Sequence, residues 1–568
     1  MRMSIVLLSG LAALAGCDGG GAPDAGHDAG MAGPDAGAVN CDLPDDVDLT
    51  CPGAPGCDGS GDGMLYAGAA AVEFTPDPAE AEPLTVDVDG DGELDSADGD
   101  QFTDTNGNGM YDAVWIAGFG NGRAARSVDN PQWARAIALR ENDVTIVFVS
   151  LDAVGWFFGD SDPIREMTAD LEIDHLSISA THTHEARDTI GIWGRTLDES
   201  GRSPAFMAHV QERAAQAVRD AVGALRPANI QYASLRLRDQ PGGLLRYVGD
   251  SRDPQVIDDE VRILRLMEAG DGPTIATLVN LASHPEYAGS RNTALSSDYP
   301  NWLRLGIENG VEGPDGPLAG VGGIAVFING ALGAQIGPGR VQPQTWDGTD
   351  VPRGTIEASQ TVGEEMAAFV LTALGPTGGS TTQMTASLGF RRHRFFAPIE
   401  NRRYHIAFLQ ELFVRDVYCY NPDYAIRPTQ NIPFALTEVA VIDVGDATMI
   451  TIPGELDPAL FVGGYDGSYA PDGVPVVDTT QENPPDLTMA PSGPYLRDLA
   501  RSDAQQVWLL GLTNDFLGYL LPEFDYELDQ FLPYIGEAPG DHYEETNSIG
   551  PMGWPTIHEA LMEVLGAR

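Results

Sequence analysis

Two histidines stand two positions apart where an apolar run ends, in the segment SISATHTH (177–184). Residues i and i+2 of an extended strand point to the same side, so the side chains of His182 and His184 can face one site. Imidazole is a common zinc ligand and also carries protons near neutral pH. The same pair would equally fit two hydrogen-bonded histidines at a strand end, so the hypothesis of a metal site needs further ligands.

Two more metal-binding side chains follow apolar runs further along the chain. His284 ends the segment TLVNLASH (277–284), and Glu455 ends the segment MITIPGE (449–455). Histidine nitrogen and carboxylate oxygen are ordinary zinc ligands. Three donors delivered by separate strand ends are typical of a catalytic zinc that keeps one position open for water. The sequence therefore favours an enzyme whose metal activates a water molecule.

Four short segments occur in the order and spacing of the neutral, non-lysosomal ceramidases, and the chain resembles that family. Two further stretches are similar to family features: HYEETNSIGP (542–551) to a tyrosine-containing segment late in the catalytic domain, and AGFGNGRAARSVDNPQWARAIALR (117–140) to a glycine loop with its following strand. The resemblance covers most of residues 64 to 554. The four segments are Thr181-His182-Thr183-His184, Leu281-Ala282-Ser283-His284, Pro453-Gly454-Glu455 and Asn514-Asp515-Phe516-Leu517-Gly518-Tyr519.

The resemblance implies hydrolysis of the amide bond of ceramide or a related N-acyl lipid, as in sphingolipid breakdown. In this reaction the metal lowers the pKa of an attacking water, and His184 beside it passes a proton to the departing amine. Tyr543 and Arg246 are further catalytic candidates, which would stabilise the oxyanion or orient the substrate. The zinc ligands implied by the resemblance are His182, His284, Glu455 and Tyr519.

Four of the candidate residues have an alternative interpretation. Tyr519 is an unusual zinc ligand and would otherwise be a core tyrosine with a hydrogen-bonded hydroxyl. Asp298 in SSDYP (296–300) would orient a zinc-ligating histidine or cap the helix that begins there. Gly118 and Gly120 would let the backbone approach the substrate, or would only form a tight turn.

The chain departs from the family pattern in two places. Where the family has a serine near the metal, the segment NGALGAQIGP (329–338) has Gly337, so a covalent route through that serine is not expected. The C-terminal β-sandwich domain of bacterial ceramidases has no counterpart before Arg568. Two alternatives therefore stay open: a hydrolase or esterase of other N-acyl or acyl compounds, and an inactive, calcium-stabilised surface lipoprotein that binds a lipid or a partner.

The segment DVDGDGELDSAD (87–98) has the oxygen spacing of a calcium loop, with Gly92 at the sixth position to permit the sharp turn. A second run, DTNGNGMYD (104–112), repeats the first part of that pattern. We predict that these loops bind structural calcium; the alternative is an acidic, unstructured surface insertion. The predicted ligands are Asp87, Asp89, Asp91, Asp95, Asp98, Asp104, Asn106, Asn108 and Asp112.

Residues 1–17 have the features of a bacterial lipoprotein signal peptide. The apolar run from Ile5 to Ala15 is too short to span a bilayer, and Leu14-Ala15-Gly16-Cys17 resembles a lipobox. Cleavage before Cys17 would leave that residue to carry acyl chains, so we expect an exported protein anchored in the cell envelope through lipid alone. Residues 18–63 would form a flexible tether with a cysteine-rich extension, and residues 64–568 one hydrolase domain with the insertion at 87–112.

The formal charge of −52 excludes nucleic acid as a partner, because phosphate binding needs clustered lysine and arginine. The expected partners are an N-acyl lipid or small amide substrate and, through the anchor, the membrane; the oligomeric state stays open. Cys41, Cys51, Cys57 and Cys419 form an even set in an exported chain. One or two disulfides are expected, with three full pairings possible.

Apolar and amphipathic runs predict the elements that would position these residues. Their alternation predicts a mixed α/β fold with a layered sheet core and helices, and the paired strands add antiparallel character. The stretch between 375 and 435 is read as irregular. The predicted helices cover 162–171, 203–225, 299–309 and 355–374, and the predicted strands lie within 143–155, 175–184, 228–238, 259–267, 274–284, 323–332, 436–455 and 505–512.

Overall fold

The computed structural model describes residues 47–54, 57–88, 94, 99–105, 107, 109–270, 272–337, 341–421, 431–500 and 503–566. Cys17 and Cys41 lie outside these ranges, as do six of the predicted calcium ligands: Asp89, Asp91, Asp95, Asp98, Asn106 and Asn108. Over the described ranges, no helix combines the length and apolarity needed to cross a bilayer.

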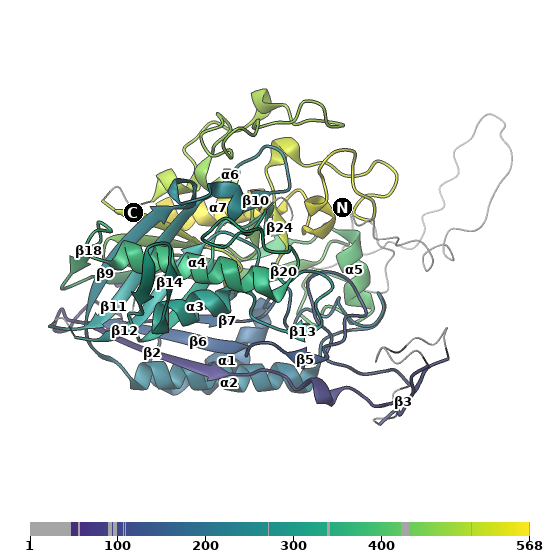
Figure 1. The fold of residues 1–568 in the computed structure, drawn as a ribbon, viewed down its shortest axis with the longest axis horizontal. Coiled ribbons are helices and arrows are strands. Elements are labelled where there is room, and N and C mark those ends of the chain that lie inside the picture. The colour runs from purple at the N-terminus through teal and green to yellow at the C-terminus, as the bar shows by residue number, and fades with distance from the viewer. Residues whose placement is uncertain are drawn as a thin grey trace, which may run out of the picture.

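The larger of two main sheets has nine strands and carries most of the predicted strand segments (Figure 1). Neighbouring strands are antiparallel except for β7 with β8 and β12 with β16, which are parallel. A short strand, β18 (Thr381–Gln383), pairs with β9. The other strands, in spatial order, are β16 (Ile324–Asn329), β12 (Thr274–Leu281), β11 (Glu260–Glu268), β9 (Arg226–Arg236), β2 (Leu65–Glu73), β6 (Trp133–Glu141), β7 (Val144–Leu151) and β8 (His175–Ala180).

The second sheet has five strands and packs face to face on the first. Its strands, in spatial order, are β1 (Val47–Cys51), β19 (Leu388–Pro398), β20 (Phe434–Val444), β21 (Ala447–Thr451) and β23 (Gln506–Leu510). The core between the sheets combines Ile137 and Phe148 of the larger sheet with Ile442 and Trp508 of the smaller one. Successive strand residues alternate between faces, so Ala136 and Val149 point to the opposite side.

Helices cover the outer face of each sheet, which gives four layers. The larger sheet is covered by α2 (Pro204–Gly223), beneath β2 and β6 in Figure 1, and by α3 (Tyr299–Asn309) with α4 (Ile356–Leu374). The outer face of the smaller sheet packs against α7 (Gly553–Gly566). The shorter helices are α1 (Asp162–Met167), α5 (Arg402–Leu409) and α6 (Pro458–Val462). The predicted mixed α/β, layered fold is thus confirmed.

Short ladders complete the structure and one of them lies at the candidate site. That ladder pairs β22 (Glu455–Leu456) with β24 (Tyr519–Leu520) in parallel. The others pair β10 (Gly249–Asp250) with β17 (Gln335–Ile336), β13 (Ala294–Leu295) with β5 (Ser127–Val128), β14 (Gly310–Gly313) with β15 (Gly316–Ala319), and β3 (Leu84–Val86) with β4 (Gln101–Phe102).

Helix-capping side chains explain why three of the predicted helices begin where they do. Ser203, Asp298 and Thr355 each accept a hydrogen bond from a backbone amide in the first turn of α2, α3 and α4. Pro204 and Pro300 then occupy the first turn, where a missing amide hydrogen costs nothing. These local signals are readable from the sequence, and the predicted ranges of these helices match the structure closely.

Strand β19 lies in the stretch that the sequence analysis treated as irregular. Its sequence LGFRRHRFFAP contains three arginines and a histidine, which obscure the apolar alternation. The structure nevertheless buries Phe390 on one face of the strand and Phe395 on the other, against the two neighbouring cores. The arginines pair with carboxylates, as Arg394 does with Glu438. The pattern was therefore masked by charges that are neutralised across the sheet.

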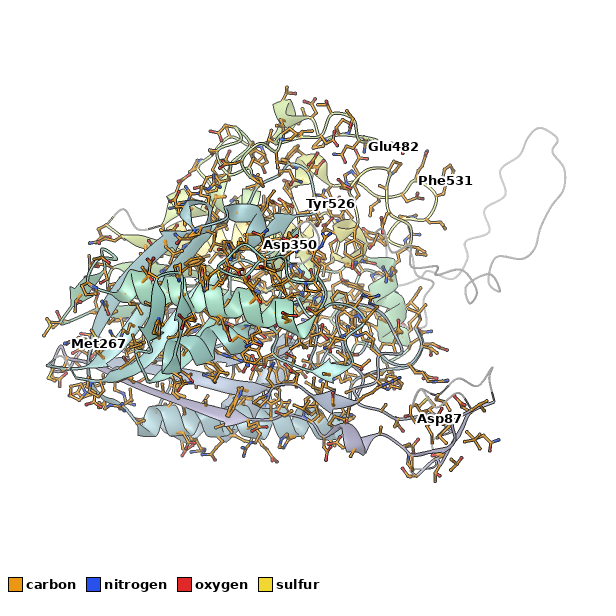
Figure 2. The ribbon with its side chains drawn as sticks, in the orientation of Figure 1. Asp87, Met267, Asp350, Glu482, Tyr526 and Phe531 are labelled. Atoms are coloured by element: carbon orange, nitrogen blue, oxygen red, sulfur yellow. A yellow bond between two sulfur atoms is a disulfide. The ribbon has the colours of Figure 1, made fainter. Side chains whose placement is uncertain are left out.

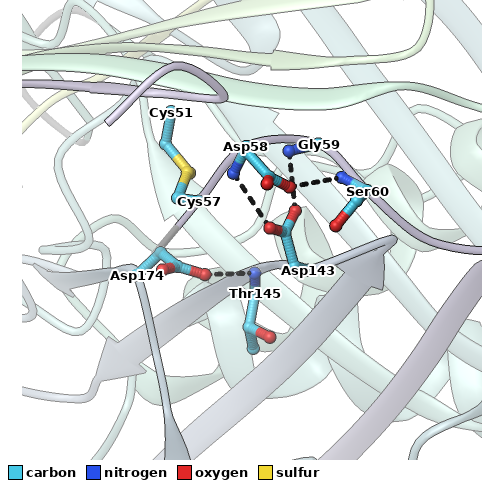
Figure 3. The surroundings of a disulfide bond; sticks show 8 residues. All are labelled: Cys51, Cys57, Asp58, Gly59, Ser60, Asp143, Thr145 and Asp174. Carbon is cyan, nitrogen blue, oxygen red and sulfur yellow. Dashed lines mark hydrogen bonds between the residues drawn. A yellow bond between two sulfur atoms is a disulfide. The ribbon is translucent and has the colours of Figure 1, made fainter. Parts of the chain in front are cut away.

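The described residues before 64 contribute to the core, where the sequence predicted a cysteine-rich extension. Strand β1 is the edge of the smaller sheet, and Cys51 forms a disulfide with Cys57 inside the core between the sheets. The carboxylate of Asp143 then accepts hydrogen bonds from the amides of Asp58 (2.9 Å) and Gly59 (2.8 Å), as Figure 3 shows. Cys419 is disulfide-bonded as well. The described part of this segment is thus fastened to the body of the protein.

The calcium-type insertion projects from the body at β3 and carries Asp87 (Figures 1 and 2). In its described part, Asp104 accepts backbone hydrogen bonds from Gly107 (2.6 Å) and Gly109 (2.9 Å). Glu82 accepts another from the amide of Asp112 (3.2 Å). In these turns, a carboxylate accepts hydrogen bonds from the backbone amides. Calcium binding in the insertion stays a prediction.

A buried charge cluster fixes the C-terminal loop that contains Tyr543. Arg252 is 1% exposed and contacts the carboxylates of Asp525 (2.9 Å), Glu544 (3.4 Å) and Glu545 (2.8 Å). Burial, together with the neighbouring Glu545 and against the attraction of Arg252, raises the pKa of Glu544 to about 7. One guanidinium therefore faces three carboxylates, and its single positive charge does not compensate all of them.

This imbalance predicts that Glu544→Gln stabilises the protein at alkaline pH. The folded chain binds the Glu544 proton more tightly than the unfolded chain, so stability falls as pH rises from the ordinary value of 4.5 toward about 7. At pH 8 the variant should exceed the parent by on the order of 1–3 kcal/mol, and the difference should vanish near pH 4. Thermal or urea unfolding across this range measures it. A gain that is the same at pH 4 and pH 8, or one reproduced by Glu559→Gln on the exposed side of α7, would contradict the assignment.

Candidate functional site

One asparagine side chain ties together the loops that carry His182 and His284. Asn329, at the end of β16, donates from Nδ2 to the carbonyl oxygens of Thr181 (3.2 Å) and Ser283 (2.9 Å). Each of these residues directly precedes one of the histidines. All the groups concerned are buried, so the hydrogen bonds would cost several kcal/mol to leave unmade. The two histidine loops are therefore held at a fixed spacing.

The loop after β23 is fastened to β8 in a similar way. The backbone amide of Ile178 donates to Asn514 Oδ1 (2.9 Å), and the hydroxyls of Ser179 and Thr513 are 2.8 Å apart. Asn514 itself has a φ of 68°, a left-handed conformation that asparagine tolerates better than most residues. This loop leads to β24, where Tyr519 lies beside Glu455 in the parallel ladder. The predicted fourth ligand is thus brought next to the third.

Backbone carbonyls decide which ring nitrogen of two histidines faces the site. His182 Nδ1 lies 2.5 Å from the carbonyl oxygen of Val154, and His284 Nδ1 lies 3.1 Å from that of Gln335. A carbonyl oxygen only accepts, so each Nδ1 carries a hydrogen and each Nε2 is left with its lone pair in the neutral ring. Both Nε2 atoms turn inward, which is the arrangement of a metal-ligating histidine held by its outer nitrogen.

The carboxylate of Glu455 joins the two inward-facing rings. Its Oε2 is 3.1 Å from His284 Nε2 and 3.4 Å from His182 Nε2. Burial opposes ionisation, but attraction to His182 and His284 outweighs it and lowers the pKa of Glu455 to about 2. Tyr519 lies almost parallel to the His284 ring, with centroids 6.4 Å apart, and burial raises its pKa well above the ordinary value. Glu455 is therefore the anionic centre of the group.

His184 belongs to the same cluster as the predicted ligands. Its Nε2 lies 3.2 Å from His182 Nε2, and the facing atoms of His182, His184 and His284 all lie within 4.8 Å of one another. Burial, followed by the neighbouring His182 and His284, lowers the pKa of His184 well below its ordinary value. A third imidazole thus faces the point on which the other two converge.

Glu286 is a site residue that the sequence analysis missed. Its Oε2 lies 3.4 Å from His184 Nδ1, the nitrogen on the far side of the ring. Burial, reinforced by Asp298, raises the pKa of Glu286 to about 8, although the backbone amide of Gly337 donates to the carboxylate. The available signal was its position two residues after His284, in the segment SHPEY (283–287).

The glycine loop encloses His184 from one side. Gly118 has a φ of 103°, and a Cβ placed there would lie 2.3 Å from His184 Cγ, so only glycine fits. The Phe119 ring meets His184 edge to face at 5.0 Å, and Arg123 donates to the His184 carbonyl oxygen (3.1 Å). A Cβ on Gly120 would meet nothing within 4 Å. Of the two glycines, Gly118 therefore has a steric role, and it is His184 that approaches it.

Three other predicted residues occupy different surroundings. Asp298 accepts hydrogen bonds from the amides of Tyr299 (2.6 Å) and Ala288 (2.8 Å), so it caps α3, the alternative that the sequence left open. Arg246 forms an ion pair with Glu365, and these contacts give no support to a role at the reacting carbonyl. Tyr543 is 44% exposed, with its ring 6.3 Å from that of Tyr519. It therefore lies at the open side of the cluster.

The position of the missing serine is filled by another side chain. A Cβ placed on Gly337 would lie 2.6 Å from Tyr287 Cε2 and 3.0 Å from the carbonyl oxygen of His284. Tyr287 is fully buried, and its hydroxyl donates to the carbonyl oxygen of Tyr247. A serine could not enter without displacing this ring, so the absence of a serine is built into the packing.

The residues that meet here fit a bound metal ion. Three imidazole nitrogens and one carboxylate are directed at one another in a buried space, an arrangement that needs a positive charge at its centre. Nitrogen and carboxylate donors suit zinc, whose structural and catalytic sites use them routinely. The group can therefore hold a metal ion, and its donor chemistry is that expected for zinc.

Solved structures that are similar to this chain include a neutral ceramidase from Pseudomonas aeruginosa and a ceramidase complexed with C2. Each superimposes with a TM-score of 0.57 at 13% identity, covering 89% of this chain and 75% of the other. The fold is that of the neutral ceramidases. A scan of the sequence against family models gives no match, and a search of curated proteins gives none either. The ceramidase resemblance found in four short segments is thus confirmed at the level of the fold.

The steric role of Gly118 in this ceramidase-type fold predicts a marked difference between two neighbouring glycines. Gly118→Ala should destabilise the protein by about 1–3 kcal/mol, because its Cβ displaces the His184 ring and its φ is unfavourable for alanine. Gly120→Ala, the matched control, should change stability by less than about 0.5 kcal/mol. Equilibrium unfolding in urea measures both. Equal effects of the two substitutions would contradict the packing described for His184.

Proposed function

We propose that this chain is a zinc-dependent hydrolase of linear amide bonds that acts on ceramide or a related N-acyl lipid. The observation that carries the proposal is the convergence of His182, His284 and Glu455 on one point, within the fold of the neutral ceramidases. Zinc bound there by these residues and Tyr519 would supply a Lewis acid and lower the pKa of a water molecule. The proposed classification is an N-acylsphingosine amidohydrolase type of enzyme.

The side chains of the site have separate tasks in this proposal. Val154 and Gln335 hold the outer nitrogens of His182 and His284, so that both rings keep their inner nitrogens toward the centre. His184 faces the same centre through Nε2, takes up the proton released by the attacking water and delivers it to the departing amine. Tyr543, on the open side, would orient the amide. With Gly337 at the serine position, no covalent intermediate forms there.

A small pocket lined mainly by apolar side chains lies beside the cluster, and its cavity of about 10 Å³ holds no more than a water-sized group. Phe516 is tilted against His182, with ring centroids 5.9 Å apart, and lines the pocket. Its walls favour contact with hydrocarbon over contact with a polar group, but an acyl chain would enter only if these side chains moved apart. The other aliphatic and aromatic lining residues include Phe157, Tyr404, Phe408, Phe413 and Leu517.

Two further elements of the proposal concern the setting of the enzyme. We place it at a bacterial cell envelope, attached through acyl chains on Cys17, on the strength of the lipobox-like segment. We also propose structural calcium in the insertion at 87–112, because the spacing of its acidic residues suits that ion. Neither element is needed for the chemistry at the histidine cluster.

One observation favours a different function, that of a surface lipoprotein that binds a lipid without cleaving it. The Tyr287 ring fills the serine position at Gly337, so the chain lacks a group that the resemblance associates with the reaction. Against it, three histidines and a carboxylate remain buried and aligned, which is costly in a protein that uses no cation. Hydrolysis is therefore the proposed function, and the experiment below separates the two.

The decisive substitution is His284→Ala in the full chain, purified without a histidine tag. The parent should contain one equivalent of zinc and hydrolyse a fluorescent N-acyl-sphingosine. The variant should lose the zinc and at least about 100-fold in kcat/KM, because an inner donor is removed. Elemental analysis and release of the labelled fatty acid measure the two effects. His209→Ala, which removes an exposed histidine of α2, is the control and should match the parent.

Other outcomes would change the conclusion in a defined way. A parent that binds zinc but turns over an acyl ester and no amide would support the esterase alternative. A parent that contains no zinc and shows no turnover, but binds the fluorescent lipid, would support the lipoprotein that only binds. Zinc retained in His284→Ala would mean that His284 is not a ligand.

A further inference from the structure

We propose that Glu286 is a positioning residue for His184, which it holds through Nδ1 so that Nε2 stays directed at the cluster. The inference rests on the proposed function, since it gives Glu286 a part in the same hydrolysis. His184 lies between two neighbours in this arrangement. Glu286 Oε2 is 3.4 Å from its Nδ1, and His182 Nε2 is 3.2 Å from its Nε2.

Each of these two residues, Glu286 and His184, has a buried polar atom without a hydrogen-bond partner in the described part of the chain. Within the described part of the chain, His184 Nδ1 and Glu286 Oε1 are buried without a hydrogen-bond partner. Glu286 is 4% exposed and His184 is 8% exposed. A buried polar atom in this state is costly, so a small shortening of the 3.4 Å contact with Glu286 Oε2 would give His184 Nδ1 a partner. Catalytic hydrogen bonds are often long in structures without substrate and tighten when the site is filled.

The backbone keeps the two residues in register. The amide of His184 donates to the carbonyl oxygen of Pro285 (3.0 Å), the residue immediately before Glu286. From the other side, the amide of Gly337 donates to the Glu286 carboxylate. The glycine at the serine position therefore helps to place this glutamate. The orientation of the carboxylate toward His184 is fixed from both directions.

The pairing also differs from that of two other buried carboxylates, Asp152 and Glu185. Asp152 pairs with Arg304 and Glu185 with Arg123, which compensates each charge with a guanidinium. The ion pair described for Glu286 is with an imidazole, His184. A carboxylate placed behind the ring of a proton carrier is a recurrent way to fix which nitrogen faces the substrate. The contact between Glu286 and His184 therefore contributes little to stability as an ion pair, but it fixes the orientation of the His184 ring.

The proton balance of the proposed step is simple. A hydrogen remains between His184 Nδ1 and Glu286 throughout. Nε2 gains one proton from the attacking water and gives it to the nitrogen of the cleaved amide, so the ring returns to its starting form. Glu286 keeps the Nε2 atom directed at the cluster during both transfers. It acts only through His184.

Glu286→Ala tests this role through a split between kcat and KM. The variant should keep one equivalent of zinc and an unchanged KM, while kcat falls about 10- to 100-fold, the usual effect of removing a group that orients a site histidine. Glu286→Gln retains a hydrogen-bonding group at the same position and should recover most of kcat. Glu308→Gln, at a carboxylate that pairs with Arg135, is the control and should behave as the parent.

A measurement that does not depend on turnover separates this inference from the proposed function. In protein labelled with ¹⁵N-histidine, the parent should show a hydrogen-bonded imidazole N–H resonance that is lost in His184→Ala and in Glu286→Ala. If the parent is inactive but shows this signal, the proposed hydrolysis fails and the pairing stands. If Glu286→Ala retains the signal, keeps kcat within twofold of the parent, or loses its zinc, the positioning role is overturned.

Discussion

The arrangement of the site depends on the contact of one carboxylate oxygen with two histidines. Glu455 Oε2 lies 3.1 Å from His284 Nε2 and 3.4 Å from His182 Nε2, in surroundings from which water is largely excluded. A buried carboxylate is stable only with a matching positive charge, so the group requires protons or a metal ion at this point. Both rings are already turned for this purpose by the carbonyl oxygens behind them.

Much of the fold and part of the site could be predicted from the sequence because local signals carried them. Strand β7 is a continuous apolar run buried on both faces, and α3 begins at a capping aspartate followed by Tyr-Pro. The donors His182, His284 and Glu455 each follow an apolar run, which made them visible before their contacts were known. Strand β19 was missed because its arginines are neutralised by partners such as Glu438, a tertiary effect that periodicity cannot register.

The remaining site residues are defined by partners distant in the chain. Glu286 is a site residue because it contacts His184, which lies about a hundred positions away in the chain. In the sequence, its only link to the site is its position two residues after His284. Arg246 is neutralised by Glu365 on α4, which no spacing pattern indicates. Gly337 was noticed as a missing serine, but only the packing of Tyr287 explains why the position has no side chain. Motifs thus identified the donors, whereas side-chain contacts across the fold identified what surrounds them.

The Asn329 side chain has a mechanical consequence for the protein. Because a single amide grips the carbonyls just before both ligating histidines, a displacement of either loop is passed directly to the other. The spacing between the two histidine loops is therefore constant, because separating them would break the buried hydrogen bonds of Asn329. Adaptation to ligands of different shape must therefore come from exposed side chains at the open side of the cluster, such as that of Tyr543, while the gap between the rings stays constant.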